Sequence, residues 1–150
     1  MPLYILLIGM IVLLDQLMKY FIQANIPLNV SYEVIPGVLS IGHVRNYGAA
    51  WSMMLGQRWF FIVIGLLALV VLSYYLKKLY QNWLYALGFA FLISGTLGNL
   101  LDRLLTGYVV DMFELDFINF PVFNIADCAL TLGVIVVLIA MMRDKEGLFV

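Results

Sequence analysis

Apolar residues gather in four long stretches, each close to the ~20 residues that an α-helix needs to cross a bilayer core. The stretches cover about residues 2–22, 59–76, 83–101 and 123–142. The second contains no charged side chain, whereas charged residues lie within the first and the fourth and directly at the end of the third. The pattern predicts an all-α membrane protein, a four-helix transmembrane bundle that forms a single integral membrane domain over residues 1–150.

The first apolar stretch also has to be weighed as a cleaved signal peptide. It lacks a basic segment ahead of the apolar run and a clear small-residue cleavage site, and Asp15 interrupts it. We therefore expect it to be a retained transmembrane helix.

The two long connections, residues 23–58 and 102–122, contain short alternating patterns. Residues 38–44 (VLSIGHV) and 113–117 (FELDF) alternate in the manner of β-strands. We expect these connections to form a small extracytoplasmic β-element beside the four-helix bundle.

Basic residues predict the orientation of the bundle. The connection between the second and third stretches and the C-terminal segment carry Lys77, Lys78, Arg143 and Lys145, and the opposite side carries Arg45, Arg58 and Arg103. Because basic residues are enriched on the cytoplasmic side, this distribution places both termini in the cytoplasm. The long connections are then extracytoplasmic.

Composition agrees with a membrane protein and excludes several other classes. The chain is 65% hydrophobic and only 11% charged, whereas about a quarter of the residues in soluble domains are charged. A net charge of −1 offers no basic surface for nucleic acid. Cys128 and His43 are single residues of their types, so we expect no internal disulfide, no metal site and no cofactor.

Four aspartates from separate segments are predicted to lie at one depth, near the outer membrane interface. They are accompanied by three asparagines at the same level; the set is Asp15, Asp102, Asp111, Asp127, Asn46, Asn99 and Asn124. Ionisable residues at membrane depth are costly to bury and usually mark a functional site.

Some of these residues also have structural explanations. Asp15 and Lys19 are four residues apart, so they can form an ion pair on one helix face. Asp102 is followed directly by Arg103, and a helix-end ion pair is as good an explanation for it as a role in a site. Glu114 and Asp116 are expected on a solvated strand face.

Small and aromatic residues are interpreted in the same way. Gly95 and Gly98 are predicted to allow close packing between helices. Cys128 is expected to be a small packing residue, and His43 lies too far outside to be its catalytic partner. Lipid-facing or interfacial anchors are predicted at Trp51, Met53, Met54, Trp59, Trp83 and Tyr85.

Asp111 and Asp127 lack such an explanation, because neither has a basic residue within helical reach. Two carboxylates held close together can share one proton, so that one acts as a base and the other as an acid. Such a pair can activate water and protonate an amide leaving group. The two residues therefore predict hydrolysis at the outer membrane face.

Five blocks of sequence resemble the lipoprotein signal peptidases, the bacterial type II signal peptidases. In the order of that family they are DQLMK at 15–19, RNYGAAWS at 45–52, SGTLGNLLDR at 94–103, VVD at 109–111 and FNIAD at 123–127. The combination of GN-x-x-DR with N-x-AD is highly specific. Three departures are visible: Ser94 replaces a common glycine, and Tyr47 and Trp51 replace a commoner Thr and Phe.

The resemblance implies an intramembrane aspartic endopeptidase with an extracytoplasmic β-cradle, with Asp111 and Asp127 as catalytic residues. Supporting or substrate-lining positions of the family fall on Asn46, Gly48, Asn99, Arg103, Asn124 and Ala126. Asp15, Lys19 and Asp102 match positions linked to the fold and to the surroundings of the site. The implied substrate is a prolipoprotein carrying diacylglycerol on a cysteine, cut just before that cysteine.

The same resemblance implies a bacterial cytoplasmic membrane protein whose partners are lipidated prolipoproteins and membrane lipids, and which acts as a monomer. Two other classes stay open on the residues alone. A polar-core transporter or proton channel also uses membrane aspartates, but it would need polar residues at inner depth. A serine intramembrane protease would need Ser94 and a histidine at a common depth, and His43 is in the outer segment.

Overall fold

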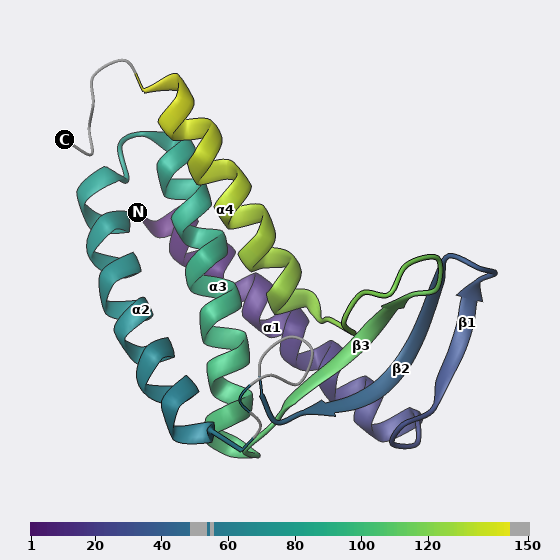
Figure 1. Cartoon of the computed structure of the whole chain (residues 1–150). Coiled ribbons are helices and arrows are strands. Elements are labelled where there is room, and N and C mark those ends of the chain that lie inside the picture. Colours follow the sequence, from purple (N-terminus) through teal and green to yellow (C-terminus); the bar gives the residue numbers. More distant parts are fainter. Residues whose placement is uncertain (49–53, 55, 145–150) are drawn as a thin grey trace.

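The computed structural model describes residues 1–48, 54 and 56–144, and in them the chain forms four long helices and three strands (Figure 1). In chain order these are α1 (Pro2–Asn25), β1 (Ser31–Ile35), β2 (Leu39–Asn46), α2 (Arg58–Leu79), α3 (Trp83–Leu105), β3 (Val109–Leu115) and α4 (Ile125–Arg143). All four helices are long and apolar enough to cross a membrane. The predicted class, a four-helix transmembrane bundle with a small β-element, is confirmed.

The first three helices extend beyond the apolar stretches that predicted them, whereas α4 begins at Ile125, two residues after the predicted start. α2 ends at Leu79, so Lys77 and Lys78 belong to its last turn and not to the following connection. Cations in a last turn interact favourably with the C-terminal end of the helix dipole. α3 continues to Leu105, so Asp102 and Arg103 are helical residues. A hydropathy pattern predicts that a helix ends at the first charged residue. These helices continue past that residue, because a charged side chain does not interrupt the backbone hydrogen bonds of a helix.

α3 lies at the centre of the bundle and carries most of its buried helical residues. Close approach of α3 and α4 requires glycines on both helices: a Cβ on Gly88 would lie 2.6 Å from Val137 Cγ2, and one on Gly133 would lie 2.7 Å from Leu92 Cγ. Gly95 meets the backbone of α4 in the same way. The predicted close-packing role of Gly95 is confirmed.

The strands form one antiparallel sheet in the order β1-β2-β3. β2 matches the predicted 38–44 segment, whereas β3 begins at Val109, four residues before the predicted strand. Alternation fails at the start of β3 because Val109 and Val110 are both buried. Ile22 of α1 packs with Val110 and Met112, which fixes the sheet to the C-terminal end of α1. β1, exposed along its whole length, was not predicted.

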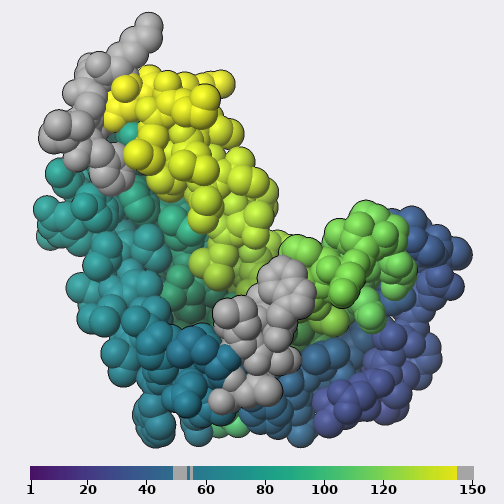
Figure 2. Space-filling view, viewed as in Figure 1, coloured from purple at the N-terminus to yellow at the C-terminus, as the bar shows by residue number. Residues whose placement is uncertain are grey.

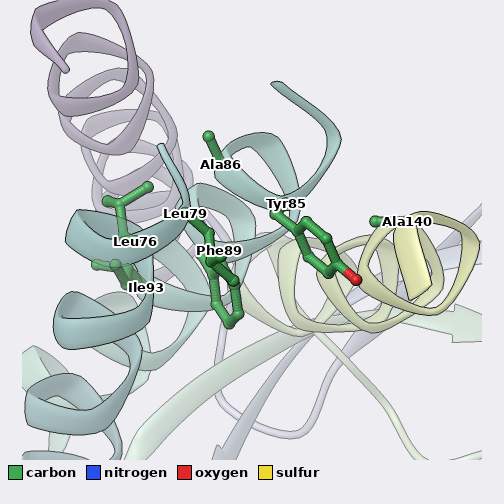
Figure 3. Packing of buried hydrophobic residues seen from close by; sticks show 7 residues of the cluster. All are labelled: Leu76, Leu79, Tyr85, Ala86, Phe89, Ile93 and Ala140. Atoms are coloured by element: carbon green, nitrogen blue, oxygen red, sulfur yellow. The ribbon is translucent and has the colours of Figure 1, made fainter. Parts of the chain in front are cut away.

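The two ends of the bundle differ in what they carry. Figure 1 shows the N-terminus, the α2–α3 turn and the end of α4 at one end, and the sheet at the other. Apolar residues fill the first end (Figure 3); the cluster consists of Leu76, Leu79, Tyr85, Ala86, Phe89, Ile93 and Ala140.

The predicted aromatic anchors separate into two groups. Trp59 and Trp83 are exposed, at 71% and 61%, as expected of residues facing lipid or the interface. The prediction for Tyr85 is wrong: only 1% of it is exposed, because it faces the neighbouring helices and packs near Phe89. Met54 is exposed, whereas Trp51 and Met53 lie outside the described residues.

Candidate active site

The start of α4 fixes the position of Asp127. Asn124 is the N-cap residue: its side-chain Oδ1 accepts from the Asp127 backbone N–H at 2.9 Å. In return, Asp127 Oδ2 accepts from the Asn124 backbone N–H at 3.1 Å. This reciprocal capping box follows from the local spacing Asn-x-x-Asp. It holds the carboxylate in the first turn of the helix, where the helix dipole favours a negative charge.

The segment after β3 brings the start of α4 back to that strand. Phe123 exchanges backbone hydrogen bonds with Phe113, at 2.8 and 3.0 Å, and accepts another from Met112 N. Asp111 is the neighbour of Met112 in β3, and its side chain is buried. The antiparallel return therefore sets Asn124 beside Asp111, although the two residues lie thirteen positions apart.

Two asparagines donate to Asp111 from different elements. Asn124 Nδ2 lies 2.6 Å from Asp111 Oδ1, and Asn46 Nδ2, at the end of β2, lies 3.0 Å from Asp111 Oδ2. The Asn46 amide is held in this sense because its Oδ1 accepts from the backbone N–H of Gly48 at 2.9 Å. Both carboxylate oxygens of Asp111 thus have a donor.

Asn99 of α3 completes the link between the carboxylates. Its Nδ2 donates to Asp127 Oδ1 at 2.8 Å, and its Oδ1 accepts from Asn124 Nδ2 at 3.1 Å. Asn124 therefore touches Asp111 and Asp127 directly and Asn99 as well. The structure thus brings together Asp111 and Asp127 with the three asparagines that were predicted at the same depth.

Burial and the neighbouring Asp127 carboxylate raise the pKa of Asp111 to about 7, against the opposing effect of the donors Asn46 and Asn124. A carboxyl group with this pKa can hold a proton near neutral pH. It can then give up that proton to a leaving group, which an ordinary exposed aspartate cannot do.

Asp15, Lys19 and Asp102 form a buried ion triad next to this cluster. Lys19 Nζ lies 2.8 Å from Asp15 Oδ2, which confirms the predicted i, i+4 pair. Lys19 Nζ also lies 2.9 Å from Asp102 Oδ2. The alternative of a helix-end pair between Asp102 and Arg103 is therefore wrong. Adjacent residues on a helix point about 100° apart, so Asp102 faces α1 while Arg103 faces elsewhere.

Arg103 faces the cavity side of α3. Its Nη2 donates to the carbonyl of Gly48 at 3.0 Å and its Nη1 to the carbonyl of Asn99 at 3.2 Å. The guanidinium carbon lies 4.8 Å from the ring centre of Phe61 in α2, a cation–π contact. The side chain therefore anchors the end of the β2 segment to α3 and α2 at the edge of the site.

Ala126 serves the site through its backbone and its small size. Its N–H donates to Asp15 Oδ1 at 2.9 Å, and the residue is fully buried. A Cβ on Gly98 would lie 3.1 Å from Ala126 Cβ and 2.7 Å from Asp15 Oδ2. The predicted packing role of Gly98 is therefore confirmed, and it brings α1, α3 and α4 together directly beneath the carboxylates.

Asp111 and Asp127 line a cavity of about 950 Å³ between α2, α3, α4 and β3. Its other walls are mainly apolar and include Phe61, Ile64, Gly65, Ala68, Leu100, Leu130 and the segment 120–123. On the face shown in Figure 2, the helix bundle and the sheet meet at an angle. The polar pair therefore stands at the wall of a large apolar space.

Several cavity residues were not identified from the sequence, because they are apolar or weakly polar positions inside transmembrane stretches. Thr96 and Thr131 donate to helix carbonyls four residues earlier, so their hydroxyls are satisfied within their own helices. Cys128 also lines the cavity and is half-buried, which corrects its interpretation as a mere packing residue.

Other expectations concerned chemistry away from this cluster. His43 is buried in β2, and its Nδ1 contacts the carbonyl of Ile26 at 2.9 Å, at the junction of α1 and the sheet. Ser94, the first departure from the family pattern, donates to the Ala90 carbonyl at 2.6 Å and is buried without strain on its neighbours. Within the described part of the chain, no group of three His, Cys, Asp or Glu side chains is arranged to hold a metal ion.

Comparison with known proteins gives a consistent result. The family model for signal peptidase (SPase) II matches residues 7–143 of this chain. The chain is 49% identical to a lipoprotein signal peptidase of Lactiplantibacillus plantarum over 146 residues, which is 97% of this chain and 98% of that protein. It is 48% identical to the lipoprotein signal peptidase of Latilactobacillus sakei over 147 residues, 97% of each chain.

Solved structures agree with the sequence relatives. A bacterial membrane enzyme determined by the in meso method at 2.3 Å resolution superposes with a TM-score of 0.91 at 39% identity, covering 97% of this chain and 91% of that one. A second, at 1.9 Å resolution, gives a TM-score of 0.88 at 39% identity and covers 97% and 96%. The predicted membership of the signal peptidase II family is confirmed.

Proposed function

Because the chain belongs to the signal peptidase II family and is a peptidase, we propose that it is an aspartic endopeptidase whose catalytic pair is Asp111 and Asp127. Its substrates are prolipoproteins that carry diacylglycerol on a cysteine, and it cuts the chain just before that cysteine. The site lies near the outer face of the bacterial cytoplasmic membrane, with both termini in the cytoplasm. The enzyme acts as a monomer with membrane lipids around it and without a cofactor.

One observation carries this proposal: two buried carboxylates from separate elements, joined through Asn124, stand at the wall of a large apolar cavity. Carboxylates are expensive to bury at membrane depth, and a purely structural acid is usually paired with a cation. Lys19 satisfies Asp15 and Asp102 in this way, whereas the donors in direct contact with Asp111 and Asp127 are all neutral among the residues that the structure describes. That difference supports a chemical role for the second pair.

The pair divides the work of hydrolysis between a base and an acid. The ionised carboxylate takes a proton from a water molecule as that water attacks the scissile carbonyl. The protonated carboxyl gives its proton to the leaving nitrogen, and a pKa of about 7 for Asp111 suits this exchange. Arg103 or an asparagine amide steadies the developing oxyanion.

The cavity suits a substrate that is itself a membrane component. Apolar walls from α2 and α4 can receive acyl chains and an apolar peptide segment, while the scissile amide lies against the polar wall. Binding energy from these apolar parts would orient the amide toward the pair. A peptide bond unwound from a helix also needs new hydrogen-bond partners in this environment, and Asn46 and Arg103 are the nearest candidates.

The rival classes fit the arrangement less well. A proton pathway needs polar groups along its length, whereas the end of the bundle opposite the sheet is filled by the apolar cluster of Figure 3. A serine protease would need Ser94 near a histidine, but the Ser94 hydroxyl is turned to its own helix and His43 contacts the end of α1.

The test is cleavage of a defined precursor by the purified protein in lipid or detergent. A precursor lipidated on its cysteine should be cut immediately before that residue, with the product mass identifying the bond. The same precursor without lipid should be left intact, and Asp127→Asn should abolish cleavage of the lipidated form. Cutting at another bond, or equal cleavage of the unlipidated precursor, would contradict the proposed specificity.

A further inference from the structure

Lys19 touches both the ion triad and the polar cluster of the proposed site. Its Nζ lies 2.8 Å from Asp15 Oδ2 and 2.9 Å from Asp102 Oδ2, and it donates to Asn99 Oδ1 at 3.1 Å. The side chain is only 2% exposed. An ammonium group has three donors, so two of them serve the triad and the third leads toward Asp127 through Asn99.

The side-chain amide of Asn99 has an acceptor, Oδ1, and a donor, the Nδ2 group. Its Oδ1 accepts from Lys19 and its Nδ2 donates to Asp127 Oδ1 at 2.8 Å. Turning the amide over would set its NH₂ group against the Lys19 ammonium, and an ammonium has no acceptor to receive it. The turned amide would also place Oδ1 against the Asp127 carboxylate. The contact with Lys19 therefore favours the orientation in which Asn99 donates to Asp127.

We propose that Lys19 is a positioning residue for cleavage: it holds Asn99 in the orientation that supports Asp127. The inference rests on the proposed catalytic pair and goes beyond it, because it gives the triad lysine a part in turnover as well as in the fold. Asn124 Nδ2 donates to the same Asn99 oxygen at 3.1 Å, so removal of Lys19 weakens the restraint without abolishing it. The expected loss is therefore about tenfold, the lower range for a hydrogen bond that involves a charged group.

Gln16 supplies a matched control within the same network. Its Nε2 donates to Asp102 Oδ1 at 2.9 Å, to Asp15 Oδ2 at 3.2 Å and to the Gly98 carbonyl at 3.2 Å. These bonds reach the triad and α3, and they do not end on Asn99. Gln16→Met should therefore weaken the fold while leaving the orientation of Asn99 as it is.

The experiment is a double-mutant cycle between Lys19→Met and Asn99→Leu. Each purified variant is measured by thermal melting and by single-turnover cleavage of lipidated precursor over a range of precursor concentrations. Lys19→Met should lower the maximal rate by about tenfold, with half-saturation unchanged, because the bonds of the Asn99 amide end on Lys19, Asp127 and Asn124 within the protein. In the Asn99→Leu background the same substitution should change the rate by less than about twofold. Gln16→Met should lower the melting temperature and keep the maximal rate.

The proposal would be overturned if the two losses were independent. The double variant would then be slower than Asn99→Leu by the same factor by which Lys19→Met slows the native enzyme. A Lys19→Met enzyme with an undiminished rate per folded molecule would also overturn the proposal. Lys19→Met leaves two buried carboxylates uncompensated, which can prevent the variant from accumulating. In that case the cycle is made in an Asp15→Asn background, so that Asp15→Asn and Lys19→Met together remove one negative and one positive charge. An active Asp127→Asn enzyme would instead refute the catalytic pair itself, so the two failures are distinguishable.

Discussion

The two ends of the helix bundle are built on the same contact between α3 and α4 but serve different purposes. At the end away from the sheet, Gly88 meets Val137, and the surrounding space is filled by Tyr85, Phe89 and other apolar side chains. At the sheet end, Gly98 meets Ala126 and the Asp15 carboxylate. Small residues bring the helices together at both ends, and at the second end this closeness also holds the buried carboxylate of Asp15 against α3 and α4.

The comparison shows how one helix can separate stability from chemistry. Buried side chains in the first half of α3 are apolar, whereas its last turns present Asn99 to the candidate pair and Asp102 to Lys19. Dispersion and close packing stabilise the first region, and a connected hydrogen-bond network organises the second. Substitutions should therefore affect folding alone at one end, and folding together with turnover at the other.

The largest effect is expected at the proposed catalytic pair. Asp111→Asn and Asp127→Asn should each lower single-turnover cleavage by about a thousandfold or more while the protein still melts cooperatively, because shape is kept and proton exchange is lost. The double variant should be little slower than either single one, since residues that act as a unit do not contribute additively. A double variant slower by the product of both losses would contradict a shared mechanism.

The pH dependence of cleavage should reveal the shared proton. Because burial and Asp127 raise the pKa of Asp111 to about 7, the pair keeps its proton below that pH and loses it above. The maximal rate should then fall by about tenfold per pH unit on the alkaline side. Asp116→Asn, a change at an exposed aspartate bonded to Ser40, is the control and should leave this limb in place. A rate still rising above pH 9 would refute the acid role.

Matched glycine substitutions test the difference between the two ends directly. Gly88→Ala and Gly98→Ala each force a methyl group into a tight contact, so each should lower the free energy of unfolding by about 1–3 kcal/mol. Gly98→Ala should in addition slow cleavage, because its methyl group displaces the Asp15 carboxylate and Ala126. Gly9→Ala, where no atom lies within 4 Å of the added carbon, is the control. If Gly88→Ala and Gly98→Ala reduced the cleavage rate per folded molecule equally, the proposed difference between the two ends of the bundle would be refuted.

Asp102→Asn should act mainly on stability. Asp102 Oδ2 accepts from Lys19 and from the backbone N–H of Val110 at 3.2 Å, so it joins the end of α3 to β3 just before Asp111. Loss of its charge leaves Lys19 with a single carboxylate partner, and we expect a lower melting temperature with a smaller loss of rate per folded molecule. A stable but inactive Asp102→Asn enzyme, beside an active Asp111→Asn enzyme, would transfer the catalytic role to Asp102.

The smallest effects concern Cys128 and metal ions. Cys128→Ser should keep cleavage within about threefold of the native rate, because the thiol lines the cavity and no base among the described residues is hydrogen-bonded to it. Treatment with EDTA should also leave the rate unchanged, as expected for two carboxylates that act on water without a metal. Recovery of an EDTA-inactivated enzyme by added zinc would contradict this prediction.

The sequence by itself determined the membrane class and the residue set of the site. Four apolar stretches of bilayer length have no stable alternative to membrane-crossing helices, because backbone polar groups must be satisfied inside each segment. Aspartates and asparagines in such a chain stand out by their desolvation cost. The Asn124–Asp127 capping box was available from spacing alone, since it joins residues three positions apart.

Tertiary structure decided which cation pairs with Asp102, whereas the spacing of Asp15 and Lys19 had already predicted their pair. In the sequence Asp102 is next to Arg103, yet helix geometry turns Asp102 toward Lys19 of α1 and Arg103 toward Gly48. Likewise Tyr85 looks like an interfacial anchor until the neighbouring helices cover it. The periodicity of the sequence predicts on which face of a helix or strand a residue lies. The residue that it contacts on that face depends on how the helices cross.

The connection between Asp111 and Asp127 depends partly on the sequence and partly on the tertiary structure. Their similar depth follows from the order of the stretches, but their common partner depends on the return of Phe123 along β3. That return is a long-range backbone pairing, and burial of Met112 and Val110 against α1 stabilises it. Sequence therefore determined which groups the site contains, and the packing of β3 between α1 and the start of α4 determined how they meet.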